Sequence, residues 1–186
     1  MIEYCHRPQD FDQLIWNGLK IIQENDVLIH LGDICFGKSD IETHFHLQGG
    51  VKGTKILVRG NHDRKTALWY MDHGWDFVCD KLSGVWFGKR ILFTHEPQPK
   101  EKNIDMNIHG HFHNAAINYA MNEFRNFEYD PKWHRLLALE YTNYKPVDLE
   151  KIINEPRTTI IGTKATVPRE KLSGTQEEIP PRSVAS

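Results

Sequence analysis

Few cysteines, no long apolar run and almost no net charge characterise this sequence, and each shortage excludes a class of protein. The three cysteines, Cys5, Cys35 and Cys79, show no C-x-x-C spacing, which argues against a disulfide framework or a zinc ribbon and favours a reducing cytoplasm. No apolar run approaches the roughly 18 residues of a membrane span, and no signal-peptide pattern follows Met1. The net charge of −2 provides no field that would attract nucleic acid or an anionic membrane. We therefore expect a cytoplasmic protein with no membrane partner and no strong nucleic-acid binding.

Histidine, in contrast, is abundant. Eleven histidines occur among 186 residues, and four of them, His95, His109, His111 and His113, lie in one short stretch. The remaining composition, 39% hydrophobic and 26% charged, is that of an ordinary globular protein. Because imidazole is a common ligand of transition metals, this concentration of histidine points to metal chemistry.

Hydrophobic periodicity predicts helices alternating with strands in the first half of the chain. The first predicted helix ends at residue 25, and two further helices are predicted over residues 39–48 and 64–73. Asp10 and Gln13 have the form of a capping box for the first of these helices. Apolar runs over residues 26–31 and 55–58 predict buried strands, and each run leads into a polar loop.

The second half of the chain has mostly β-type patterning. Short strands are predicted over residues 75–79, 84–87, 90–94, 107–113 and 136–141. Gly88 and Lys89 form a candidate hairpin turn. Residues 155–186 contain four prolines and no aromatic residue, so we expect a disordered tail there and one domain over residues 1–154.

Polar side chains lie at or just after the ends of several predicted strands. These positions are Gly32-Asp33, Gly60-Asn61-His62-Asp63, Thr94-His95 and Gly110-His111-Phe112-His113. Their oxygen and imidazole groups are metal ligands, and the scaffold of strands can hold them at one sheet edge. Glycine beside a ligand permits a tight turn and a close approach of the backbone to an anion. Two neighbouring ions at such an edge would clamp a phosphate and activate a water molecule.

These segments resemble four of the five motifs of the calcineurin-like metallophosphoesterases. The matching stretches, in the family's order and spacing, are Leu31-Gly32-Asp33, Gly60-Asn61-His62-Asp63, Thr94-His95 and His109-Gly110-His111-Phe112-His113. The resemblance extends over about residues 1–150. It implies an α/β (α+β) fold, a two-sheet β sandwich flanked by helices.

The resemblance also implies a role for each matched residue. Asp33 would bridge two metal ions, and Asn61, His95 and His111 would complete one metal site with it. His113 would belong to the other metal site. His62 would contact the phosphoryl group or protonate the leaving oxygen, and Asp63 would orient His62.

One family motif is not among the matches. The first motif, Asp-x-His at the end of the first strand, precedes the region that resembles residues 2–8, so Met1 comes too late to include it. The resemblance therefore implies a phosphoesterase domain over residues 1–154 that is N-terminally truncated and lacks its first strand. Only Asp33 and His113 would then remain for the second metal site. Three interpretations are open: a start codon assigned too far downstream, a truncated remnant, or a protein that works with one firmly bound ion.

The function hypothesis that follows is a metal-dependent phosphoesterase acting on phosphomonoesters or phosphodiesters through a metal-activated hydroxide. The cofactors would be divalent Mn, Fe, Zn or Co, two in a full-length form and one at a firm site here. The substrate would be a small phosphoester or nucleotide, and the oligomeric state is left open. The alternative is a catalytically impaired protein of the same family that binds metal or phosphate at one intact site.

Several other histidines and arginines have simpler interpretations. His30 and His109 lie in β-type runs and are interpreted as core residues or as supports of neighbouring ligands. A packing or solvated role is favoured over metal ligation for His6, His44 and His46. Surface solvation is favoured over phosphate binding for Arg7, Arg59 and Arg64.

Overall fold

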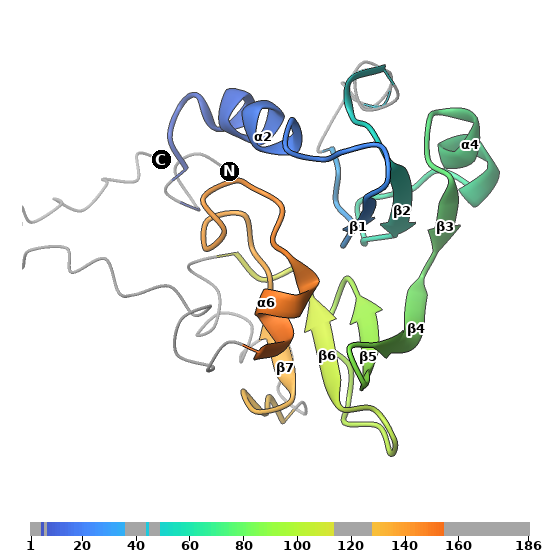
Figure 1. The fold of residues 1–186 in the computed structure, drawn as a ribbon, viewed down its shortest axis with the longest axis vertical. Helices are drawn as coiled ribbons and strands as arrows, with labels where there is room; N and C mark the ends of the chain where they lie inside the picture. The colour runs from blue at the N-terminus through green and yellow to red at the C-terminus, as the bar shows by residue number, and fades with distance from the viewer. Residues whose placement is uncertain (1–4, 6, 36–43, 45–48, 114–127, 155–186) are drawn as a thin grey trace, which may run out of the picture.

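The computed structural model describes residues 5, 7–35, 44, 49–113 and 128–154, which form a mixed α/β fold with two β-sheets (Figure 1). The helices are α2 Phe11–Leu19, α4 Ala67–Asp72 and α6 Leu149–Asn154. The strands are β1 Val27–His30, β2 Thr54–Val58, β3 Phe77–Cys79, β4 Lys81–Trp86, β5 Lys89–Thr94, β6 Met106–His109 and β7 His134–Leu136. Within this part of the chain no helix could span a membrane. The predicted mixed α/β class with two sheets is confirmed.

The two sheets differ in strand direction. The first sheet has the order β1-β2-β3, and all its strands are parallel. The second sheet has the order β4-β5-β6-β7, in which β4 and β5 are antiparallel and the other neighbours are parallel. Only Asp80 separates β3 from β4, so the chain passes from one sheet to the other within one residue.

Parallel strands are buried on both faces, and the first sheet follows this rule. Leu28 of β1 and Leu57 of β2 face an apolar cluster that also contains Ile22, Tyr70 and Trp75. Partly buried side chains of α2 and α4 pack against this cluster. Helices therefore cover one face of the first sheet.

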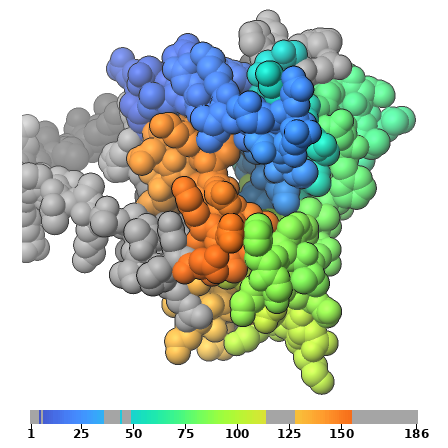
Figure 2. Space-filling view, in the orientation of Figure 1, coloured from blue at the N-terminus to red at the C-terminus, as the bar shows by residue number. Residues whose placement is uncertain are grey.

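The opposite face of the first sheet packs on a second apolar cluster, which contains residues of both sheets. Val58 of β2 shares this cluster with Ile91 and Phe93 of β5 and with Ile108 of β6. Ile152 of α6 joins it as well. Figure 2 shows the orange segment that contains α6 in contact with both the blue N-terminal part and the green second sheet. The two sheets and α6 thus share one core.

The strand predictions were more accurate than the turn prediction. The expected strands at residues 26–31, 55–58 and 90–94 correspond to β1, β2 and β5. Those at residues 107–113 and 136–141 are wrong beyond His109 and Leu136, where β6 and β7 end. The hairpin turn, however, is Phe87-Gly88 and not Gly88-Lys89, because Trp86 pairs with Lys89 and leaves a two-residue loop. Phe87 and Gly88 have φ of 51° and 73°, the positive values that a tight hairpin loop of this length requires.

The helix predictions were right in place and wrong in detail. The first helix ends at Leu19 instead of residue 25, and Asp10 occupies its N-cap without a side-chain capping bond, so the predicted capping box is wrong. The second described helix begins at Ala67, where the Thr66 hydroxyl accepts a hydrogen bond from the Trp69 N–H. The predicted helix at residues 39–48 and the predicted tail at residues 155–186 lie outside the described residues, apart from His44.

Candidate metal centre

The candidate ligands lie within three residues of the ends of strands in both sheets. Asp33 comes just after β1 and Asn61 after β2, while His95 follows β5 and His111 follows β6. In Figure 1 the arrowhead of β2 points toward the second sheet, and those of β5 and β6 point toward the first. Carboxyl ends of parallel strands are where α/β sheets place ligand sites. Here the strand ends of two sheets meet, and each sheet supplies two candidate ligands.

His95 is the centre of this group of four side chains. Its Nε2 lies 3.2 Å from Asp33 Oδ2, 3.0 Å from Asn61 Oδ1 and 3.0 Å from His111 Nδ1. The ligand atoms of Asp33, His95 and His111 all lie within 4.8 Å of one another. The predicted convergence of Asp33, Asn61, His95 and His111 is therefore present in the structure.

The other nitrogen of His95 fixes the orientation of the ring. Its Nδ1 lies 2.6 Å from the Leu31 carbonyl oxygen, so Nδ1 carries a hydrogen and donates it. Nε2 consequently faces Asp33, Asn61 and His111. A backbone carbonyl that holds one imidazole nitrogen in this way is typical of a metal-binding histidine, because it fixes which nitrogen faces the ion.

The electrostatics of the pair favour positive charge between Asp33 and His95. Burial alone would raise the pKa of the Asp33 carboxyl, but its hydrogen bonds with His95 and with the His62 N–H outweigh burial and lower the pKa. Burial alone would lower the pKa of His95, yet the Asp33 carboxylate beside it raises the pKa. A proton on His95 and a divalent cation are alternative ways to supply that positive charge.

The backbone of the loops that contain Asp33 and His111 adopts a conformation that few residues tolerate. Gly32, Asp33 and His111 have φ of 89°, 54° and 64°. Positive φ in a residue other than glycine is uncommon and concentrates at functional sites. A β-carbon on Gly60 would overlap the Asp33 carboxylate, so glycine at this position lets the two loops approach each other.

Asp63 holds the two loops together through the main chain. Its Oδ2 accepts hydrogen bonds from the N–H groups of Asp33 and Gly60, each at 2.7 Å, and its Oδ1 accepts a longer one from Ile34 at 3.3 Å. The side chain therefore positions the Asp33 backbone. The backbone N–H of the half-buried His62 donates a hydrogen bond to Asp33 Oδ1 at 2.9 Å. The catalytic roles of His62 and Asp63 stay predictions.

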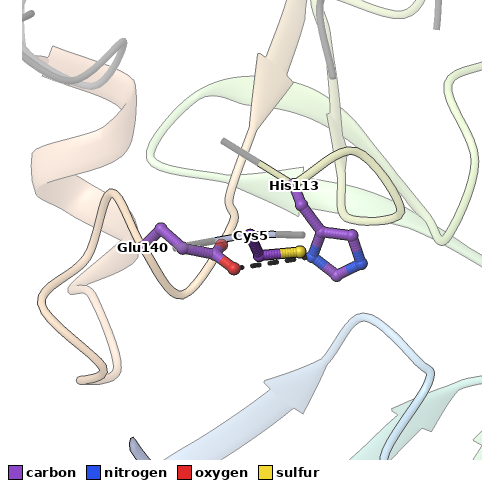
Figure 3. A group of neighbouring side chains, drawn as sticks. All are labelled: Cys5, His113 and Glu140. Atoms are coloured by element: carbon purple, nitrogen blue, oxygen red, sulfur yellow. Dashed lines mark ion pairs between the residues drawn. The ribbon is translucent and has the colours of Figure 1, made fainter. Parts of the chain in front are cut away.

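His113 lies in a different group, with Cys5 and Glu140 (Figure 3). Its Nδ1 lies 3.6 Å from Glu140 Oε1 and 3.2 Å from Arg7 Nη2. Arg7 Nε also donates to Glu140 Oε1 at 2.7 Å. Burial alone would raise the pKa of the Glu140 carboxyl, but His113 and Arg7 beside it lower the pKa to about 2. Burial, followed by the Glu140 charge, raises the pKa of the Cys5 thiol.

Comparisons with known proteins support the fold and assign no activity. No protein-family model matches the chain. The uncharacterized protein MJ1445 of Methanocaldococcus jannaschii is 27% identical over 162 residues, an alignment that covers 82% of this chain and 81% of that protein. A solved structure, the protein of unknown function AQ665 from Aquifex aeolicus, is 25% identical with a TM-score of 0.61 and covers 82% of this chain and 89% of its own. The chain is therefore similar in fold to AQ665 over most of its length.

A third similarity is weaker. It relates the chain to a structure described as a novel archaeal phosphodiesterase, with 20% identity and a TM-score of 0.43. The match covers 56% of this chain and 68% of that one. This similarity is too weak to bear on fold or function.

Sequence reasoning missed the partners of His113. Arg7 was expected on the surface, but its side chain is only 10% exposed and pairs with Glu140, so that expectation is wrong. Glu140 lies inside the predicted strand at residues 136–141, whereas β7 ends at Leu136, so the strand-end signal of the other candidate ligands did not mark it. His44 is buried and accepts a hydrogen bond from Trp75 Nε1 at 3.0 Å, which confirms its packing role. His109 is fully buried, as predicted, while His6 and His46 lie outside the described residues.

Proposed function

We propose that this protein is a metal-dependent phosphoesterase and that Asp33, Asn61, His95 and His111 hold its divalent ion. The observation that carries the proposal is the convergence of the Asp33, Asn61 and His111 ligand atoms on His95 Nε2, with His95 Nδ1 fixed by the Leu31 carbonyl. The resemblance of the same residues to metallophosphoesterase motifs supports the choice of reaction. The substrate would be a small phosphomonoester or phosphodiester, including a nucleotide.

The donor set of this group fits a transition metal. It combines one carboxylate, one amide oxygen and two imidazole nitrogens, a mixture that suits Mn, Fe, Zn or Co. Asn61 is exposed and Asp33 is half-buried, so a substrate could reach the group from that side. When bound, the ion would supply Lewis acidity and an activated water to a phosphoester.

The chain's own residues have separate tasks in this proposal. Asp63 holds the backbone of Asp33 and Gly60, so that the Asp33 carboxylate is fixed before the substrate binds. The Leu31 carbonyl keeps a hydrogen on His95 Nδ1. His62 follows Asn61 in the same loop, and we assign it contact with the phosphoryl group or proton delivery to the leaving oxygen.

Phosphate release tests the proposal. The purified chain is freed of metal, loaded with Mn, Co, Zn or Fe, and assayed with an aryl phosphate and an aryl phosphodiester. We expect activity with at least one metal, and a loss of about 100-fold or more in His95→Ala. His73→Ala is the matched control, because His73 stacks on Trp69 in α4's C-terminal region and belongs to no candidate ligand group. A chain that binds metal in the expected ratio but releases no phosphate with any of these metals contradicts the proposal.

A binding protein without turnover is the second candidate. The resemblance assigns His113 to a second ion next to Asp33. In the structure His113 instead contacts Glu140 and Arg7, which favours a protein that has one ion at the Asp33 group and no turnover. Metal content measured by mass spectrometry, together with the assays, separates the candidates. The Cys5→Ser variant is used so that an ion at the separate Cys5–His113–Glu140 group does not add to the count. About one ion per chain without turnover supports the binding protein, whereas phosphate release that His95→Ala abolishes supports the enzyme.

A further inference from the structure

We propose that Cys5, His113 and Glu140 form a second metal site, distinct from the Asp33 group, and that it takes a zinc-type divalent ion. The proposal concerns a different set of side chains and does not depend on the phosphoesterase activity. Figure 3 shows the three side chains directed toward one another from three separate segments of the chain.

The spacing of the donor atoms suits a four-coordinate ion. Cys5 Sγ, a His113 ring nitrogen and a Glu140 carboxylate oxygen all lie within 4.8 Å of one another. His113 Nδ1 lies 3.6 Å from Glu140 Oε1. Ligand bonds to zinc of about 2.0–2.3 Å in a tetrahedron imply separations of about 3.3–3.7 Å between ligand atoms. The nitrogen and the oxygen already have that separation, so they could both contact an ion once Arg7, which touches the two atoms, turns aside.

The identity of the donors selects the ion. A thiolate, an imidazole and a carboxylate are all ligands of zinc. Mg, Ca and Mn prefer sites built from oxygen, and the thiolate disfavours them. The Asp33 group has no sulfur among its candidate ligands, which gives the two sites different metal preferences. A water molecule would complete the coordination of the second ion.

Arg7 pairs with Glu140 through Oε1, and the second carboxylate oxygen is independent evidence for a further cation here. The Glu140 side chain is only 5% exposed. Glu140 Oε2 is buried and accepts no hydrogen bond from any described residue. Buried polar atoms in native proteins nearly always have a partner, and a buried carboxylate oxygen without one calls for a proton donor or a cation. A metal ion at this position would supply it.

Arg7 contacts two of the three proposed ligands and therefore affects how tightly an ion binds. Guanidinium nitrogens only donate hydrogen bonds, so the contact of 3.2 Å from Arg7 Nη2 identifies His113 Nδ1 as the acceptor. The lone pair of Nδ1 is directed at Arg7 in this arrangement, so it becomes available to an ion only when Arg7 moves away. An ion would compete with Arg7 for both His113 and Glu140, and Arg7 would have to turn aside. Removing the positive charge of Arg7 should consequently tighten metal binding about tenfold or more.

Cobalt provides a probe that reports on sulfur alone. Co²⁺ added to the metal-free full chain should produce a thiolate-to-cobalt charge-transfer band in the near ultraviolet, and Zn²⁺ should displace it. The band should disappear in Cys5→Ser and persist in the matched controls Cys79→Ser and Cys35→Ser, both of which involve partly buried cysteines. Arg7→Met should develop the band at about tenfold lower cobalt concentration.

X-ray absorption on the zinc-loaded wild-type chain gives a readout that needs no variant. One sulfur at about 2.3 Å from zinc is expected. The absence of both the sulfur shell and the cobalt band in the folded protein overturns the proposal and leaves Cys5 as a packed thiol beside an Arg7–Glu140 ion pair. Retention of the band in Cys5→Ser, or its loss in Cys35→Ser, overturns it as well. None of these outcomes depends on phosphate release.

Discussion

At the scale of single residues, His109 shows how burial controls a charge. It is fully buried at the end of β6, with Nδ1 at 2.9 Å from the Gly110 carbonyl oxygen and Nε2 at 3.2 Å from the Tyr129 hydroxyl. Burial lowers the pKa of His109 to about 3 and outweighs the opposing effect of the Gly110 carbonyl. The imidazole is therefore neutral at physiological pH and serves packing.

A pH dependence of stability follows from that lowered pKa. Between the folded value of about 3 and the ordinary value of 6.5, the unfolded chain binds a proton on His109 that the folded chain does not. Acidification through this window should lower the free energy of unfolding, by up to about 1.4 kcal/mol per pH unit from this residue. In His109→Gln, urea unfolding with a chelator present should show a slope shallower by that amount. Identical slopes in the two proteins would contradict the assignment.

Asp63 makes a prediction about the loops. Its carboxylate accepts hydrogen bonds from three backbone N–H groups. An amide in its place offers only one oxygen as acceptor, and its NH2 group would face N–H groups that also only donate. Asp63→Asn should lower the free energy of unfolding by about 1–3 kcal/mol and weaken metal binding at the Asp33 group. Urea unfolding and metal titration measure the two effects.

Asp76 is the matched control for Asp63. It accepts one backbone hydrogen bond, from Lys55, and its side chain is 54% exposed. Asp76→Asn should therefore cost less stability and leave metal binding unchanged. Equal effects of the two substitutions on metal binding would show that Asp63 does not position the Asp33 loop.

At the scale of elements, glycine governs how the two ligand loops meet. A β-carbon at Gly60 would lie 2.7 Å from the Asp33 backbone nitrogen, so Gly60→Ala should push the loops apart and weaken metal binding about tenfold or more. Gly88→Ala provides the comparison, because Gly88 has a φ of 73° and open space around it. It should cost about 1–2 kcal/mol of stability without changing metal affinity. Calorimetric metal titration of both variants checks this, and unchanged binding in Gly60→Ala would count against the site.

The strands and their polar ends could be predicted from the sequence because both signals are local. Apolar runs such as residues 26–31 place the strands, and a polar residue directly after a strand is read from its neighbours. Helix ends were less predictable: the N-cap backbone at Asp10, with φ of −95° and ψ of 19°, carries no side-chain capping bond despite the favourable pattern. The turn at Phe87 depends on strand register, which single-sequence patterning does not fix.

The Cys5–His113–Glu140 group could not be predicted because its members are distant in sequence. Arg7 and Glu140 are 133 positions apart, and only the packed fold brings them together. An arginine considered alone is far more often solvated than buried, so composition gave the wrong expectation for Arg7. The Asp33 group was predictable, although it too is long-range, because its residues resemble the motifs of a known family.

At the scale of the whole molecule, the shared core should make the two sheets unfold together. Ile108 is fully buried in the cluster that also contains Val58 of the other sheet. Ile108→Ala should lower the free energy of unfolding by about 2–5 kcal/mol, with a single transition by both circular dichroism and tryptophan fluorescence. Val85→Ala, at a side chain that is 63% exposed, should change it by about 0.5 kcal/mol or less. Two separate transitions would contradict a shared core.

The origin of the four ligands has a consequence for motion. Asp33 and Asn61 belong to loops of the first sheet, and His95 and His111 to loops of the second. An ion held by all four would join the two sheets, so its binding free energy would also oppose their separation. Amide hydrogens of β2 and of β6, on opposite sides of the shared core, should then exchange more slowly together as metal is added. In this protein metal occupancy of the Asp33 group would determine how strongly the motions of the two sheets are coupled.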